Sequence, residues 1–156
     1  EKGTAFQIFF PIVENRADLA SDQISSSVGG SEHILVVEDE CALAKSVKIS
    51  LQKLGYKVTV VNESPVALKV FNAQPHRFDL VYTDMAMPKM TGYELSQKLL
   101  GIRPDIPIVL ATGYSNLISE KTATAAGIYQ FLSKPVKIST LTRIIRERFG
   151  DRVPVN

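Results

Sequence analysis

The chain has 156 residues, of which 45% are hydrophobic and 22% are charged, as is ordinary for one globular domain. Its net charge of +2 is too small to favour nucleic acid or an anionic membrane as a partner. The single cysteine, Cys41, excludes an internal disulfide and multi-cysteine zinc sites, and we expect its thiol to be buried.

The first 32 residues differ in character from the rest of the chain. Residues 1–13 contain an alternating apolar stretch, Ala5 to Phe10, that is closed by Pro11 and predicts a short strand. Residues 14–32 are polar and rich in serine and glycine, which is typical of a flexible linker. The regular part then covers residues 33–151, and residues 152–156 form a C-terminal tail.

Short apolar runs alternate with helical patterns in this regular part. The runs are mostly continuous and β-branched, as in parallel strands that are covered on both faces. The expected strands are 34–37, 58–61, 80–82, 107–111 and 129–132. The expected helices are 43–54, one capped by Ser64, 92–100, 117–126 and 141–149. Five strand–helix repeats predict an α/β fold, a doubly wound parallel sheet with helices on both faces.

Polar and charged residues gather where these strands end. Glu38 and Asp39 follow the first strand, Asp84 the third, Thr112 the fourth and Lys134 the fifth. Ligands of open α/β sheets bind beyond the carboxyl ends of the strands, so we expect these side chains to lie together. Three carboxylates in one place repel each other, and a divalent cation is the simplest remedy. Oxygen ligands without a histidine or cysteine cluster favour Mg²⁺.

Four motifs at these strand ends resemble those of the receiver domains of two-component response regulators. They stand in that family's order, over about three-quarters of the chain. The motifs are Ile34-Leu35-Val36-Val37-Glu38-Asp39-Glu40, Asp84-Met85-Ala86-Met87-Pro88-Lys89-Met90-Thr91-Gly92, Pro107-Ile108-Val109-Leu110-Ala111-Thr112-Gly113 and Phe131-Leu132-Ser133-Lys134-Pro135. The resemblance implies the flavodoxin-like (βα)5 fold, with strand order 2-1-3-4-5.

The resemblance also implies a metal site and a phosphoacceptor. Asp84 would accept a phosphoryl group and would bind Mg²⁺ together with Asp39 and the backbone carbonyl of Ala86. Glu38 would act in the metal site mainly through water. It departs from the family's commoner aspartate, and its longer side chain leaves the exact metal geometry open. No organic cofactor is expected.

Three further roles follow from the same resemblance. Lys134 would neutralise phosphoryl oxygens, and the Lys134–Pro135 peptide bond would be cis. Thr112 would be the switch hydroxyl and Phe131 the switch aromatic. Taken alone, Phe131 is more simply a core residue, Thr112 an ordinary strand end and Lys134 a solvated lysine.

Residues 1–11 resemble the end of a histidine-kinase ATP-binding domain, in which a G-T-x-F turn precedes the last strand. With the linker and receiver that follow, this suggests the C-terminal part of a hybrid sensor histidine kinase. We expect this part to be cytoplasmic, in a kinase that could itself be attached to a membrane. The expected partners are a phosphohistidine domain, in cis or in trans, and a histidine phosphotransfer protein. Neither nucleic acid nor membrane contact is expected.

Three alternatives stay open from the sequence. The chain could be a stand-alone regulator that acts as a shuttle or phosphate sink, or a pseudo-receiver that only binds a partner. The set of Asp39, Asp84, Thr112 and Lys134 argues against the pseudo-receiver. A phosphatase with an aspartate nucleophile is the third, but Ala86 occupies the position at which a second aspartate would stand.

Overall fold

The computed structural model describes residues 30–113 and 120–150. The strands are β1 (His33–Val37), β2 (Lys57–Val61), β3 (Leu80–Asp84), β4 (Ile108–Thr112) and β5 (Gln130–Ser133). The helices are α1 (Cys41–Lys53), α2 (Ser64–Ala73), α3 (Gly92–Ile102), α4 (Glu120–Ala125) and α5 (Ile138–Phe149), with a short 3-10 turn, η1 (Pro75–Arg77), before β3. The strands form one parallel sheet in the order β2-β1-β3-β4-β5, so the predicted fold is confirmed.

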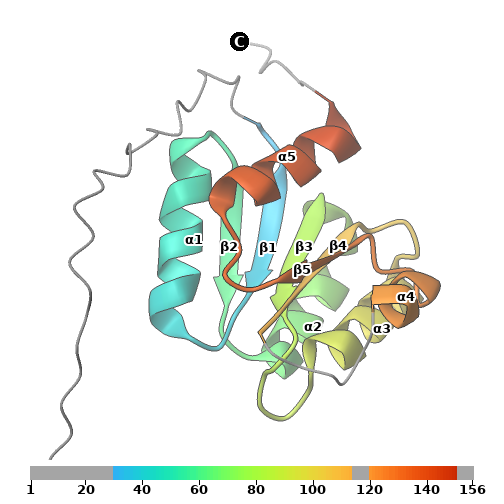
Figure 1. Ribbon diagram of the computed structural model, residues 1–156. Coiled ribbons are helices and arrows are strands. Elements are labelled where there is room, and N and C mark those ends of the chain that lie inside the picture. Colours follow the sequence, from blue (N-terminus) through green and yellow to red (C-terminus); the bar gives the residue numbers. More distant parts are fainter. Residues whose placement is uncertain (1–29, 114–119, 151–156) are drawn as a thin grey trace, which may run out of the picture.

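Helices cover the sheet on both faces (Figure 1). Successive residues of a strand point to opposite faces, so each strand serves two apolar cores. On one face Ile34, Val36, Leu80 and Tyr82 pack with α1 and α5. On the other, Leu35, Val37 and Val81 pack with α2 and α3. This double burial is why the strands are continuous apolar runs rather than alternating ones.

Several helix boundaries differ from the prediction, among them the end of α3 and the start of α2. Helix α3 continues through Gly101 to Ile102. One glycine lowers the stability of a helix by only about 1 kcal/mol, and hydrogen bonds of the next residue hold the end of this helix in place. That residue is Arg103, whose guanidinium donates to the carbonyls of Pro75 and Phe78 at 3.1 and 2.6 Å. Helix α2 begins at Ser64 itself, and its N-cap position belongs to Glu63.

The expected burial of Cys41 is wrong. Its side chain is exposed, because Cys41 is the first residue of α1 and the first buried residue of that helix is Ala44.

Several predictions fall on parts of the chain outside the described residues. These are the strand in residues 1–13, nearly all of the linker 14–32, the start of the helix predicted from Leu117, and the tail 152–156. Within the described residues, no helix is both long enough and apolar enough to span a bilayer.

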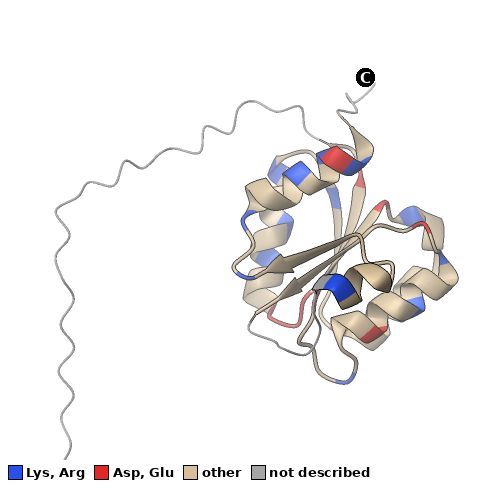
Figure 2. Ribbon diagram, turned by 45° about the vertical axis from the view of Figure 1, so that its right-hand side comes forward, with Lys and Arg blue, Asp and Glu red and all other residues tan. Residues whose placement is uncertain are grey.

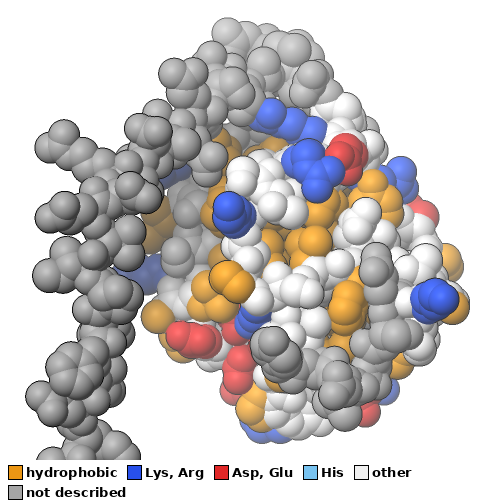
Figure 3. Space-filling model, viewed as in Figure 1, with side chains coloured by type: hydrophobic (Ala, Val, Ile, Leu, Met, Phe, Trp, Pro, Cys, Tyr) orange, Lys and Arg blue, Asp and Glu red, His pale blue; other side chains and the backbone are white. Residues whose placement is uncertain are grey.

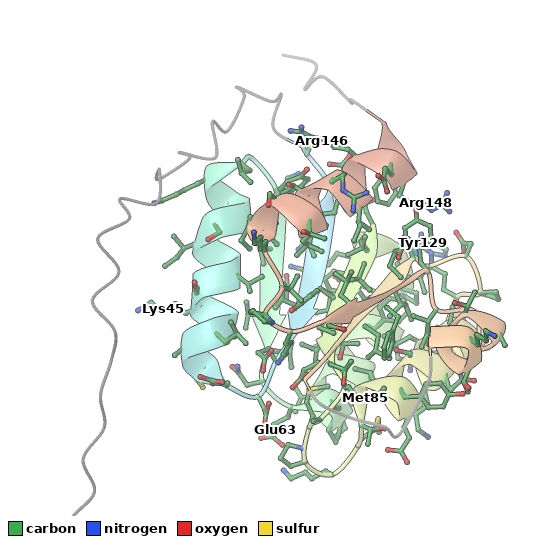
Figure 4. All side chains as sticks on the ribbon, in the orientation of Figure 1. Lys45, Glu63, Met85, Tyr129, Arg146 and Arg148 are labelled. Atoms are coloured by element: carbon green, nitrogen blue, oxygen red, sulfur yellow. The ribbon has the colours of Figure 1, made fainter. Side chains whose placement is uncertain are left out.

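Basic residues recur along α5 (Figure 2), and basic side chains lie on the surface over that helix (Figure 3). Arg143 pairs with Glu147 one turn further on, and both side chains are about half exposed or more. The Arg148 guanidinium lies over the Tyr129 ring, 5.8 Å from its centroid (Figure 4). Exposed pairs of this kind contribute about 0–1 kcal/mol, which agrees with a solvated helix face.

The start of α3 is pressed against the end of β3. Thr91 caps the helix, since its hydroxyl accepts from the Glu94 amide while the Glu94 carboxylate accepts from the Thr91 amide. A Cβ on Gly92 would lie only 1.9 Å from the Asp84 carbonyl oxygen. Only glycine therefore allows the helix to begin so close to Asp84.

Two glycine substitutions in α3 should have opposite effects. Gly92→Ala should destabilise the protein by more than about 1 kcal/mol, because the backbone at Asp84 must move to admit the methyl group. Gly101→Ala should stabilise it by roughly 0.5–1 kcal/mol, because nothing lies within 4 Å of the new Cβ. Urea unfolding of both variants measures the difference. Equal effects would contradict this account of α3.

Candidate functional site

The polar residues predicted to meet do so at the carboxyl edge of the sheet. Asp84 ends β3, Thr112 ends β4, Glu38 and Asp39 follow β1, and Lys134 follows β5. Strand β3 lies between β1 and β4, so Asp84 is central. One carboxylate oxygen from each of Glu38, Asp39 and Asp84 can be chosen so that all three lie within 4.8 Å of one another. Glu63 and Met85 lie toward this end of the molecule and Arg146 toward the opposite end (Figure 4).

Lys134 places its ammonium between two of the carboxylates. Its Nζ is 2.9 Å from Glu38 Oε2 and 3.1 Å from Asp84 Oδ1. Both carboxylates are buried, at 1% and 6% exposure of the residue. The contact with Glu38 is a hydrogen bond, whereas Asp84 Oδ1 accepts no hydrogen bond from any described residue. Within the described residues, the buried Oδ1 of Asp84 is thus stabilised by the positive charge of Lys134 alone, without a hydrogen bond.

The electrostatics of the pair follow from burial. Burial raises the pKa of Glu38, and the hydrogen bond from Lys134 offsets only part of that rise. For Lys134, burial would lower the pKa, but the contacts with Glu38 and Asp84 outweigh it and the net shift is upward. The lysine is therefore charged at neutral pH. Beneath them, burial raises the pKa of Tyr82 to about 12, so its hydroxyl is protonated.

The donor set fits a hard divalent cation. The candidate ligands are all oxygens, and among the described residues the cluster carries three carboxylates against one ammonium, that of Lys134. Asp84 Oδ1 is buried and accepts no hydrogen bond, which is unfavourable unless another positive partner is present. Asp39 is exposed beside it and leaves the approach open. Mg²⁺ prefers such sites, with one or two carboxylates and retained waters.

The remaining predicted residues surround this cluster. Ala86 lies two residues beyond Asp84 in an exposed loop, and within the described residues its carbonyl accepts no backbone hydrogen bond. Thr112 is buried at the end of β4, and its carbonyl accepts from the Lys134 amide at 2.6 Å. The Lys134–Pro135 peptide is cis, as predicted.

Phe131 is half-buried on β5. It packs against a small core made of Met85, Leu110, Ala123 and Ile128. This core joins the residue after Asp84 to helix α4. The structural reading of Phe131 as a core residue and its predicted switch role are thus compatible.

Two residues have roles at the site that the sequence did not predict. Asn62 donates from Nδ2 to the Glu38 carbonyl at 2.6 Å and so ties the end of β1 to the loop after β2. It also lines a hollow of about 220 Å³ next to Asp39. Gly92 lies within a recognised motif, but its packing on the Asp84 carbonyl appears only in three dimensions.

Comparison with known proteins identifies the family. Residues 34–146 match the family described as the response regulator receiver domain. The sensor kinase CckA of Brucella abortus is 32% identical over 155 aligned positions, which cover 94% of this chain and 16% of that protein. The chain spans only 16% to 27% of the length of the first curated relatives it matches.

Solved structures agree with the fold. A receiver domain from Clostridium thermocellum superimposes with a TM-score of 0.71 at 29% identity, covering 74% of this chain and 92% of that one. The receiver domain of a sensor histidine kinase from Pseudomonas aeruginosa has a TM-score of 0.68 at 27% identity, with 78% and 99% coverage. That structure holds a magnesium ion in its active-site cleft.

Mg²⁺ should stabilise the protein through this cluster. At a tenfold excess over its dissociation constant, the ion should add about 1.4 kcal/mol and raise Tm by roughly 3–6 °C. Asp84→Asn should abolish most of that shift, because it removes a buried anionic ligand. Glu40→Gln makes the same change of charge two residues from Glu38, outside the cluster, and should retain it. A thermal melt with and without Mg²⁺ decides; equal shifts in both variants would contradict the site.

The raised pKa of Glu38 predicts how stability depends on pH without metal. A buried carboxyl whose pKa lies above its ordinary value of 4.5 favours the folded state when protonated, and that stability is lost as pH rises through the folded pKa. A Glu38→Gln variant cannot lose stability in this way, because the glutamine side chain does not ionise. In EDTA, the variant should therefore gain stability relative to wild type between pH 4.5 and 7.5. A constant or shrinking difference in unfolding free energy would refute this.

Proposed function

The chain belongs to the response regulator receiver domain family, and from this premise we propose that Asp84 accepts a phosphoryl group from a phosphohistidine. One observation carries the proposal. Asp84 is a buried carboxylate with an oxygen that accepts no hydrogen bond from the described residues, at the centre of an acidic cluster beside a charged lysine. This arrangement offers a nucleophile and a place for the charge that develops on a transferred phosphoryl group.

The proposed reaction is a displacement at phosphorus. A carboxylate oxygen of Asp84 attacks the phosphorus atom, the P–N bond to the donor imidazole breaks, and that bond's electron pair stays with the imidazole nitrogen. The product is an acyl phosphate on Asp84. Lys134 stands 3.1 Å from Asp84 and is placed to neutralise one phosphoryl oxygen, and the Thr112 hydroxyl to donate to another.

Mg²⁺ would be held by Asp39, Asp84 and the Ala86 carbonyl, with Glu38 acting through water. When bound, it supplies positive charge to the phosphoryl oxygens and offsets the repulsion among the carboxylates. The acidic cluster supports this, as does the magnesium ion in the related Pseudomonas aeruginosa domain.

We further propose that the acyl phosphate switches the face formed by α4, β5 and α5. A hydrogen bond from Thr112 to the phosphoryl group would draw the end of β4 inward, and Phe131 would follow into the space beside Leu110. Phe131 already contacts the core that joins Met85 to α4. The modification would thus shift an existing equilibrium between two packings.

The setting we propose is the C-terminal receiver of a hybrid sensor histidine kinase. The match to CckA covers 94% of 156 residues, about 147, whereas residues 34–146 number 113, so it includes sequence outside the receiver. Partners would be the kinase's phosphohistidine domain and a histidine phosphotransfer protein, in the cytoplasm where the kinase meets ATP. The second candidate is a stand-alone regulator. The transcriptional regulator GlrR of Escherichia coli, 29% identical over 122 residues, shows that this domain also matches proteins other than sensor kinases.

A small phosphodonor such as acetyl phosphate tests the proposed function. Wild type should gain the mass of one phosphoryl group in the presence of Mg²⁺, and EDTA should prevent it. Asp84→Ala should not be labelled, because among the described residues no other buried carboxylate oxygen of the site lacks a hydrogen bond. Glu40→Gln should be labelled at a rate within about threefold of wild type, since it lies outside the cluster. Equal labelling of wild type and Asp84→Ala would overturn the proposal.

A further inference from the structure

Resting on the proposed function, we infer that Glu38 is a positioning residue for Lys134. Its carboxylate holds the ammonium at the site when Mg²⁺ engages Asp84. The lysine is then already in place when a phosphoryl group arrives. Glu38 has this role because of its length, which the commoner aspartate lacks.

The carboxylates differ in how far their oxygens are already engaged. Glu38 uses both: Oε2 accepts from Lys134 Nζ at 2.9 Å, and Oε1 accepts from the Glu40 amide at 3.4 Å. Asp84 Oδ1 accepts no hydrogen bond, and within the described residues Asp39 makes no side-chain hydrogen bond or ion pair. An incoming cation therefore meets a Glu38 carboxylate whose two oxygens already accept hydrogen bonds, whereas among the described residues Asp84 Oδ1 is held only by the charge of Lys134.

The reach of the side chain decides the contact with Lys134. Removing one methylene shortens a side chain by about 1.5 Å. With the Lys134 ammonium where it lies now, 2.9 Å from Glu38, an aspartate at this position would leave its oxygens roughly 4 Å from Nζ, beyond hydrogen-bonding distance. An aspartate could make the contact only if the ammonium moved toward it.

Metal binding would otherwise displace the lysine. A cation on Asp84 repels the ammonium that lies 3.1 Å from that carboxylate. The Lys134 side chain is 22% exposed, so it has a path to solvent. Glu38 is almost completely buried and fixed by Glu40, and it keeps the ammonium at the edge of the site after Asp84 has turned to the metal.

The mobility of Lys134 can be followed directly by NMR. Full-length protein carrying ¹³C-labelled lysine is recorded with and without Mg²⁺, and no phosphodonor is added. In wild type, the Lys134 ε-methylene should stay restrained in both states. In Glu38→Gln and Glu38→Asp it should be restrained by Asp84 without metal and become mobile when Mg²⁺ is added. Release of Lys134 by Mg²⁺ in wild type, or continued restraint in both variants, would overturn the inference.

A Mg²⁺ titration of the same variants separates positioning from metal ligation. Glu38→Gln and Asp39→Asn each remove one negative charge, so a difference between them reports direct ligation. Asp39→Asn should weaken binding at least about tenfold, and Glu38→Gln should weaken it several-fold less. If Glu38→Gln weakens binding as much as Asp39→Asn, Glu38 is a direct metal ligand and the inference is wrong. Phosphoryl acceptance by Asp84 would stand in that case, because neither measurement involves it.

Discussion

The structure depends on an imbalance of charge at one edge of its sheet. Three carboxylates converge there, and the described residues supply one ammonium, that of Lys134, which lies within 3.1 Å of two of them. Burial makes this imbalance costly, because charges in a protein interior interact more strongly than in water. A site of this kind favours a bound cation. The proposed Mg²⁺ would in turn let a group with negative oxygens, such as the proposed phosphoryl group, enter beside the carboxylates.

The arrangement of the strands and of helix α3 determines where the residues at that edge lie. Parallel strands bring five chemically useful residues from four separate places in the sequence to one line, and the central strand β3 carries Asp84. Helix α3 begins so close to Asp84 that only Gly92 can stand there. The residue after Asp84, Met85, belongs to the small core that includes α4 and Phe131. Met85 thus connects the end of β3 by direct packing to α4 and Phe131, which is the route that the proposed switch would use.

Much of this could be predicted from the sequence, because β-branched runs and strand-end motifs are local signals. The strands, the order of elements and the meeting of Asp39, Asp84, Thr112 and Lys134 all followed from them. The features that could not be predicted depend on contacts between residues that are far apart in the sequence, or on where a helix begins. The hydrogen bond from Lys134 to Glu38 joins residues 96 positions apart. At the present position of the ammonium, it also depends on the extra methylene group that makes glutamate longer than aspartate. The end of α3 at Ile102 depends on contacts of Arg103 with a different loop, and the exposure of Cys41 on where α1 begins.

The central claim is that the phosphoryl group is accepted by the side-chain carboxylate of Asp84. Chemical trapping of the acyl phosphate tests this claim most directly. Borohydride reduces an aspartyl phosphate to homoserine, so the phosphorylated chain can be reduced, digested and mapped by mass spectrometry. The account predicts homoserine at position 84 and nowhere else, only when Mg²⁺ and the phosphodonor are both present. Homoserine at Asp39 or another aspartate, or its absence from a chain that has gained the phosphoryl mass, would contradict it.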